Sequence, residues 1–141
     1  MIIKAENLTK TYKAGPSLVT AVDHVNLTVG ETAFVAIVGP SGSGKSTLLN
    51  LIGLNDYQTS GKSFFDTTGA ASLSNSERRK IRLRRMGFIF QTFNLLPTLN
   101  ALENVELPMS LTGKAQQEQR EKAVTLLEKV GLGKRVLHRP K

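Results

Sequence analysis

Residues 33–54 constrain the chain most, because they place a glycine-rich loop between an apolar run and an amphipathic helical pattern. The run 33–38 is unbroken and apolar, as is typical of a buried parallel strand. The loop 39–46 fits G-x-x-x-x-G-K-[ST] at every fixed position. Apolar residues then recur at positions 48, 49, 51, 52 and 54, which predicts a helix. Strand, glycine loop and helix in this order predict a loop that binds nucleotide phosphates.

The residue types in this loop suit a triphosphate and Mg²⁺. Its glycines let backbone N–H groups turn inward, and the N-terminus of the following helix adds about half a positive charge. We expect Lys45 to reach the β- and γ-phosphates and the Ser46 hydroxyl to bind Mg²⁺. A flexible Gly/Ser linker is the alternative, and the flanking strand and helix argue against it. The predicted phosphate-binding residues are Gly39, Pro40, Ser41, Gly42, Ser43, Gly44, Lys45, Ser46 and Thr47.

Length and composition set outer limits. A chain of 141 residues is long enough for one domain with a core. It contains no cysteine, so disulfides and thiolate metal sites are excluded. The N-terminus lacks the apolar segment of a targeting signal, and no apolar run approaches the roughly 18 residues of a membrane span. We therefore expect a soluble, cytoplasmic protein.

The formal net charge of +8 is concentrated in one place. Residues 1–75 are balanced, with five lysines against five acids, whereas residues 76–85 alone carry +5. Such a cluster can bind nucleic acid or anionic lipid headgroups. Ser74 and Glu77 form the pattern of a helix capping box, and no aromatic residue interleaves the cations for base stacking. We therefore interpret the cluster as a solvated helix face.

The pattern of the N-terminal residues predicts an antiparallel pair of strands at the edge of the fold. Residues 2–8 and 19–29 have strand patterns, with a polar loop 9–17 between them. Tyr12 falls in this loop, and the local sequence leaves open whether its ring stacks on a base or packs on the sheet. A short strand is expected at 63–66, followed by a loop 67–74 and the basic helix.

The remaining pattern is a strand followed by helices. Residues 86–90 form a second buried strand candidate, which ends at Gln91 and precedes an apolar loop, 93–97. Helices are predicted at about 100–111 and 115–130, with Pro108 distorting the first and Gly131 ending the second. No internal repeat is present.

Over its whole length the chain resembles the nucleotide-binding subunits of ATP-binding cassette (ABC) transporters. The resemblance rests on Tyr12, on the complete loop 39–46 and on Gln91, which ends a strand 46 residues after Lys45. Within that family the runs 34–50, 88–97 and 103–108 resemble the lipoprotein-release and macrolide or antimicrobial-peptide export subclass.

The resemblance implies a fold, cofactors and partners. The fold is α/β: a P-loop NTPase with a RecA-like core, an N-terminal antiparallel β edge and the start of an α-helical subdomain, divided into residues 1–91 and 92–141. The cofactors are ATP and Mg²⁺, with Tyr12 on the adenine and Gln91 on Mg²⁺ and near the γ-phosphate. Two such subunits sandwich ATP and drive a transmembrane permease at the inner face of the membrane, and no nucleic acid is expected. Phe93, Leu95 and Leu96 are candidates for the permease contact, or alternatively pack within the helical subdomain.

The chain also departs from the family pattern. The family continues with a Leu-Ser-Gly-Gly-Gln signature, a Walker B strand ending in Asp-Glu and a switch histidine, and residues 1–141 contain none of these. Neither Asp23 nor Asp66 follows a Walker B strand, and neither His24 nor His138 matches the switch position. The sequence therefore predicts a C-terminally truncated cassette that binds ATP without efficient hydrolysis and has no complete catalytic set.

Two other classes stay open beside this interpretation. A self-sufficient, non-hydrolysing nucleotide-binding module would carry the same loop. A GTPase or a small-molecule kinase would share it too, but the Asn-Lys-x-Asp motif of GTPases is missing.

Overall fold

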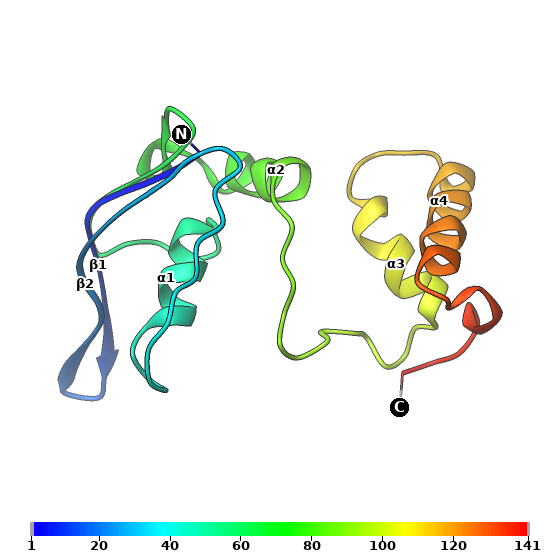
Figure 1. The fold of residues 1–141 in the computed structure, drawn as a ribbon, viewed down its shortest axis with the longest axis horizontal. Coiled ribbons are helices and arrows are strands. Elements are labelled where there is room, and N and C mark those ends of the chain that lie inside the picture. The colour runs from blue at the N-terminus through cyan, green and yellow to red at the C-terminus, as the bar shows by residue number, and fades with distance from the viewer. Residues whose placement is uncertain (1, 141) are drawn as a thin grey trace. The chain divides into compact units, whose positions relative to one another are not determined.

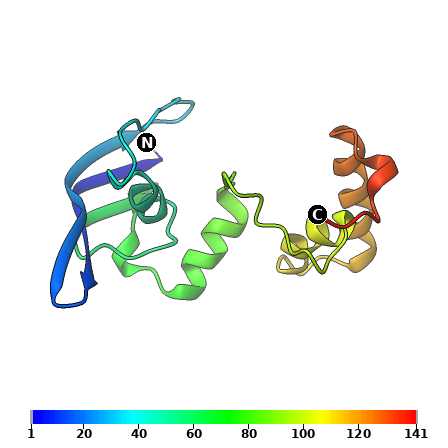
Figure 2. The ribbon, with the colours of Figure 1, turned by 90° about the horizontal axis from the view of Figure 1, so that it is seen from below.

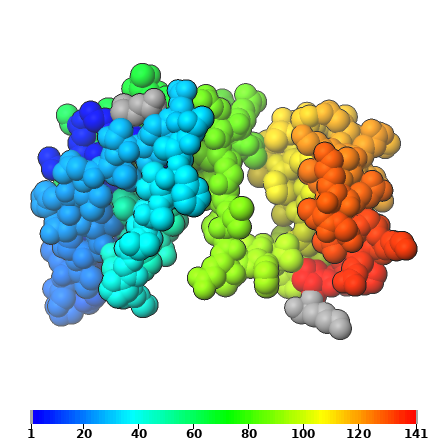
Figure 3. All heavy atoms as spheres, viewed as in Figure 1, coloured from blue at the N-terminus to red at the C-terminus, as the bar shows by residue number. Residues whose placement is uncertain are grey.

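The computed structural model describes residues 2–140 and divides into two compact units, residues 1–86 and 87–141. Figure 1 shows the elements of both units, and Figure 3 shows the surface that their side chains make. The first unit holds the sheet and the helices α1 and α2, and the second holds α3 and α4.

An antiparallel sheet forms the first unit, with strand order β2-β1-β3-β4. Its strands are β1 (Ile3–Ala14), β2 (Ser17–Val29), β3 (Ser60–Phe65) and β4 (Thr68–Gly69). β1 and β2 make a long hairpin in which Tyr12 faces Val19 and Ala14 faces Ser17. The predicted antiparallel edge is confirmed, but the predicted loop 9–17 is wrong. β3 pairs with β1 as far as Thr9, and β2 pairs with it up to Ala14, so the pairing with β2 keeps β1 extended through the predicted loop.

Helix α1 (Lys45–Ile52) covers this sheet, as the apolar stripe predicted. Leu51 is buried with Ala5, Leu8 and Val22 of β1 and β2, and Leu48 and Ile52 pack against them. This core fixes the N-terminus of α1 at the end of the glycine loop.

Helix α2 (Asn75–Arg85) begins where the sequence predicted. Ser74 Oγ accepts from the Glu77 N–H at 3.3 Å and Glu77 Oε2 accepts from the Ser74 N–H at 2.8 Å, so the capping box is present. Ahead of it, the predicted loop 67–74 contains β4 and a 3₁₀ turn, Ala70–Ser72. A second core, built around Leu54, Phe65 and Ala70, joins α2 to the sheet.

The interpretation of the basic cluster as a solvated face is wrong at its centre. Arg78 is only 2% exposed, and its guanidinium donates to the backbone carbonyls of Asp56 (2.9 Å) and Ala70 (3.0 Å). Arg82 donates to the Leu54 carbonyl at 2.5 Å, and Arg85 pairs with Asp66 at 3.0 Å. Arg78 and Arg82 thus bind the carbonyls of Asp56 and Leu54, just past the C-terminus of α1, where the helix dipole favours cations.

The second unit is a helical pair, seen from another side in Figure 2. α3 (Ala101–Ser110) and α4 (Gln116–Lys129) confirm the two predicted helices. Leu102, Ala123 and Leu127 form their core. Gly131 has φ 77°, which suits the left-handed residue that ends a helix. A short 3₁₀ turn, Gly133–Arg135, follows.

The two predicted buried strands, 33–38 and 86–90, do not form. Both segments lack strand pairing within the described chain. Most of their apolar side chains are exposed, Phe34 at 97%, whereas Ile37 and Met86 are half-buried. The physical reason is that a parallel strand exists only through hydrogen bonds to neighbouring strands, and residues 2–140 supply none beside these segments. The apolar composition of these two segments predicted strands, but neither segment has a neighbouring strand to pair with in the described chain.

These segments predict that the isolated chain self-associates. Phe34, Val38 and Ile89 are all strongly exposed beside unpaired backbone groups, and such edges bind neighbouring molecules. Size-exclusion chromatography should show oligomers or aggregates, and replacing Phe34 and Ile89 by serine should raise the monomer fraction. A monodisperse wild-type monomer with a sharp melting transition would contradict this and favour the self-sufficient module.

Candidate functional site

The glycine loop lies between the extended segment 33–38 and α1. Gly42 and Gly44 have φ 78° and 87°, conformations that L-residues adopt only with strain. Gly44 is also the N-cap residue of α1, and its carbonyl accepts the first helical bond, from the Leu48 N–H at 2.8 Å. The N–H groups of the first helical turn have no partner within a helix and are therefore available to an anion.

Close packing makes Gly44 the least replaceable residue of the loop. A Cβ added there would lie 2.0 Å from the Ala21 carbonyl oxygen on β2, whereas a Cβ at Gly42 would meet nothing within 4 Å.

We therefore expect Gly44→Ala to be far more disruptive than Gly42→Ala. Both variants lose about 1–2 kcal/mol of stability because alanine is strained in a left-handed conformation, but only Gly44→Ala also forces β2 and α1 apart. Urea denaturation should give a much lower midpoint for Gly44→Ala. Equal midpoints for the two variants would contradict this geometry.

The ammonium of Lys45 lies inside the loop. Its Nζ donates to the carbonyls of Gly39 (2.9 Å) and Pro40 (2.7 Å) and approaches Ser43 Oγ at 3.5 Å. Within residues 2–140, no carboxylate forms a salt bridge with Lys45. The positive charge therefore has only backbone and hydroxyl dipoles to offset it, and an incoming anion would bind it more strongly.

A cavity of about 400 Å³ opens beside this ammonium. The loop lines one side of it, and β2 lines the other from Thr20 to Asp23. Ser46 and Thr47 lie in the first turn of α1, and the Ser46 side chain is exposed. Glycine backbone, an uncompensated ammonium, a helix N-terminus and an exposed hydroxyl make a donor set that fits phosphate oxygens and their counter-cation.

Tyr12 lies on β1 near the start of α1. The residue is 41% exposed, so Tyr12 is not packed into the core. Its hydroxyl donates to Asp56 Oδ2 at 2.8 Å, and Lys10 Nζ lies over the ring, 4.8 Å from its centroid. The pKa of Tyr12 is raised, mainly because of this bond to the Asp56 carboxylate, with a smaller opposing effect of the Thr47 side chain. Tyr12 and Thr47 are thus brought together.

Asp56 and Lys10 are site residues that the sequence did not reveal. Lys10 Nζ donates to Asp56 Oδ1 at 2.7 Å and to the Tyr57 carbonyl at 2.6 Å. Burial raises the pKa of Asp56, but hydrogen bonds from Lys10, Tyr12 and the Tyr57 N–H outweigh it and hold the pKa below its usual range. Lys10 could have been found from its i, i+2 spacing to Tyr12, which puts both on one face of a strand. Asp56 has no comparable signal.

Gln91 belongs to the second unit, where it is exposed. The apolar residues after it, Phe93, Leu95 and Leu96, are also exposed. The amide of Asn104 on α3 holds this segment, because its Oδ1 accepts from the Leu96 N–H at 2.8 Å and its Nδ2 donates to the Leu96 carbonyl. The first unit therefore brings together Tyr12 and the residues from Gly39 to Thr47. Gln91 belongs to the second unit.

Across residues 2–140, no helix is both long and apolar enough to cross a membrane.

Comparison with known proteins fits this geometry. The sequence model of the family described as ABC transporter matches residues 22–141, and the chain belongs to that family. It is 46% identical over 139 residues to the lipoprotein-releasing system ATP-binding protein LolD of Xanthomonas campestris, covering 99% of this chain and 58% of LolD. It is 45% identical to the macrolide export ATP-binding/permease protein MacB of Hyphomonas neptunium, covering 99% of this chain and 22% of MacB.

A solved structure shares the fold. The dimeric ATP-binding cassette MJ0796 of Methanocaldococcus jannaschii, in a post-hydrolysis state bound to ADP and Pi, superposes with a TM-score of 0.88 at 43% identity. The match covers 99% of this chain and 62% of that one. The predicted ABC cassette fold is therefore confirmed, and the chain spans about three fifths of the length of relatives such as LolD.

Proposed function

We propose that this chain is the ATP-binding part of an ABC transporter subunit of the lipoprotein-release or macrolide-export type. The observation that carries the proposal is the Lys45 ammonium, held inside a glycine loop at the N-terminus of α1 with no carboxylate partner among residues 2–140. The loop residues 39–47 bind the triphosphate, because their donors converge where phosphate oxygens would lie.

Mg²⁺ completes the proposed site. Ser46, in the first turn of α1, would supply a hydroxyl ligand, and the family resemblance assigns an amide oxygen ligand to Gln91. Phosphate oxygens and water would fill the other positions, which suits a cation that keeps part of its hydration shell. When bound, the ion offsets charge on the β- and γ-phosphates.

The proposed domain roles follow the family. Residues 1–91 carry the β edge and the nucleotide core, and residues 92–141 begin the helical subdomain. The exposed side chains of Phe93, Leu95 and Leu96 support a contact with a permease, because an apolar surface segment of this kind marks a protein interface. In the longer form, two nucleotide-binding subunits pair, and the permease holds them at the inner face of the membrane.

Residues 1–141 are proposed to bind ATP without turning it over efficiently. Both histidines are exposed, and the sequence contains no signature motif and no Walker B carboxylate. The alternative is a non-hydrolysing module that functions as it stands. The two differ in whether the segments 33–38 and 86–90 need further strands beside them.

Replacing Tyr12 tests the nucleobase part of the proposal. We expect Tyr12→Ala to weaken ATP–Mg²⁺ binding by about 1–3 kcal/mol, because stacking on the base is lost while the phosphate loop is intact. Calorimetric titration measures the change. Val19→Ala, on the facing position of β2, is the matched control and should bind as the wild type does. An unchanged affinity for Tyr12→Ala would remove the stacking role.

A further inference from the structure

We infer that Asp56 is a positioning residue for the nucleobase, and that it acts by fixing the ring of Tyr12 through the Tyr12 hydroxyl. The inference rests on the proposed role of Tyr12 in binding ATP. It adds a residue 44 positions away in the sequence, on the loop that follows the phosphate-binding helix.

The carboxylate of Asp56 uses both oxygens for this task. Oδ2 accepts from the Tyr12 hydroxyl at 2.8 Å, and Oδ1 accepts from Lys10 Nζ at 2.7 Å and from the Tyr57 N–H at 2.7 Å. The tyrosine is thus held at both ends, by the strand β1 at its backbone and by Asp56 at its hydroxyl. An exposed ring held in one rotamer binds more tightly than a freely rotating one, because less conformational freedom is lost on binding.

Lys10 defines which face of the ring is available. Its ammonium lies over the Tyr12 ring and is itself held by Asp56 and by the Tyr57 carbonyl, 2.6 Å away. A cation in this position occupies one face of the ring, so a base stacks on the other. Asp56 therefore sets both the orientation of the ring and the face that it offers.

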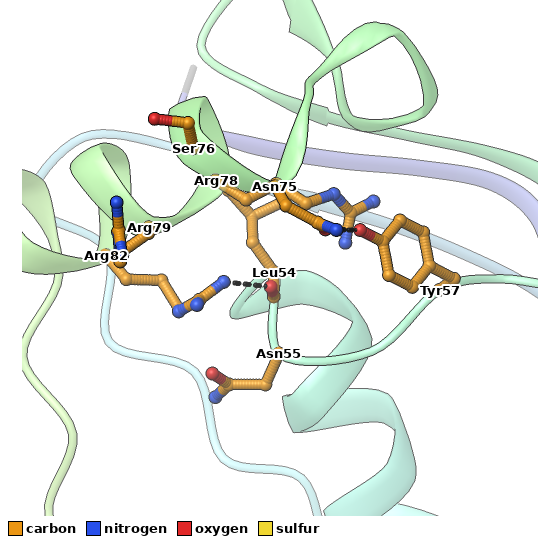
Figure 4. Close-up of a pocket in the computed structure, with 8 residues that line it drawn as sticks. All are labelled: Leu54, Asn55, Tyr57, Asn75, Ser76, Arg78, Arg79 and Arg82. Carbon is orange, nitrogen blue, oxygen red and sulfur yellow. Dashed lines mark hydrogen bonds between the residues drawn. The ribbon is translucent and has the colours of Figure 1, made fainter.

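Asp56 can act in this way because its loop is fixed from the other side. The buried guanidinium of Arg78 donates to the Asp56 carbonyl at 2.9 Å and lies 3.8 Å over the Tyr57 ring, and Arg82 donates to the Leu54 carbonyl. Figure 4 shows these arginines of α2 converging on the loop, with Tyr57 beside Arg78. The basic helix thus supports the loop that carries Asp56.

The test separates the base from the phosphates by comparing ATP with inorganic tripolyphosphate, both with Mg²⁺, in titration calorimetry on the full chain. Stacking of about 1–3 kcal/mol corresponds to an affinity ratio of roughly 5 to 150 in favour of ATP. Asp56→Ala should lower this ratio several-fold, within the range that stacking supplies, and leave tripolyphosphate affinity unchanged, and Asp56→Asn should restore part of it. Asp66→Ala also removes a carboxylate of the first unit, but one paired with Arg85, and should keep the wild-type ratio.

Tyr12→Phe is the second variant, since it removes only a hydroxyl from an exposed ring and decides the question even if Asp56→Ala does not fold. It should lower the ratio to a similar extent, and Asp56→Ala on top of it should lower the ratio no further. A wild-type ratio in Tyr12→Phe, or an equal fall in ATP and tripolyphosphate affinity in a folded Asp56→Ala, would overturn the inference alone. If Lys45→Ala leaves both affinities of the chain unchanged, the proposed function fails, and the inference with it.

Discussion

Replacing Lys45 by alanine should lower the affinity for ATP–Mg²⁺ by several kcal/mol, enough to abolish measurable binding. The ammonium has no carboxylate partner within the described chain and is the one full positive charge that the loop directs at the triphosphate. Removing it leaves phosphate charge uncompensated, and charge-assisted bonds are about twice as strong as neutral ones. Titration calorimetry on both proteins measures the loss.

The matched control for this variant is Lys62→Ala. Lys62 is an exposed lysine on β3 in the same unit, so its removal changes the net charge equally without touching the loop. It should bind ATP as the wild type does. Equal affinities of wild type and Lys45→Ala would remove the phosphate-binding role of the loop.

Residues 1–141 should release phosphate from ATP no faster than Lys45→Ala does. Turnover needs a group that orients water and charges that meet the transition state, and the loss of one such donor typically costs about 10²–10³-fold. The chain has the loop for binding, but none of its eleven acidic residues ends a Walker B strand. A phosphate-release assay with the Lys45→Ala protein as baseline measures this.

Activity should appear only when a C-terminal segment from a relative is fused or added, bringing a signature motif, a Walker B carboxylate and a switch histidine. The rate should then exceed that of residues 1–141 by at least about 10²-fold, and it should again depend on Lys45. Robust Lys45-dependent hydrolysis by residues 1–141 alone would show that a catalytic carboxylate lies among the acids already present.

Local sequence patterns predicted the structure correctly wherever it depends on residues close together in the sequence. The capping box at Ser74 and Glu77, the left-handed Gly131 and the helix after the glycine loop all form as expected. Each depends on residues within one or two helical turns, so the sequence contains the whole interaction.

The failures share a physical cause, which is pairing across long sequence separations. Residues 33–38 read as a buried strand, yet a strand needs partners that residues 2–140 do not place beside it. Conversely, β1 extends through Tyr12 because β2 pairs with it there. Arg78 is buried because the carbonyls of Asp56 and Ala70 accept its hydrogen bonds. No local sequence pattern predicts such acceptors.

The candidate site follows the same rule: its local motif was predicted, and its long-range contact was not. The loop 39–46 follows from its motif, because spacing alone fixes which atoms face the phosphates. The link from Tyr12 to Asp56 spans 44 residues and depends on where the loop after α1 meets β1, which no sequence pattern specified.

The most direct test of the central claim is a crystal structure of the chain with a non-hydrolysable ATP analogue and Mg²⁺. The triphosphate should lie in the loop 39–47, with Lys45 Nζ moved from the carbonyls of Gly39 and Pro40 onto the β- and γ-phosphate oxygens. An analogue bound elsewhere, for example on the arginines of α2, with Lys45 still donating to those carbonyls, would contradict the account.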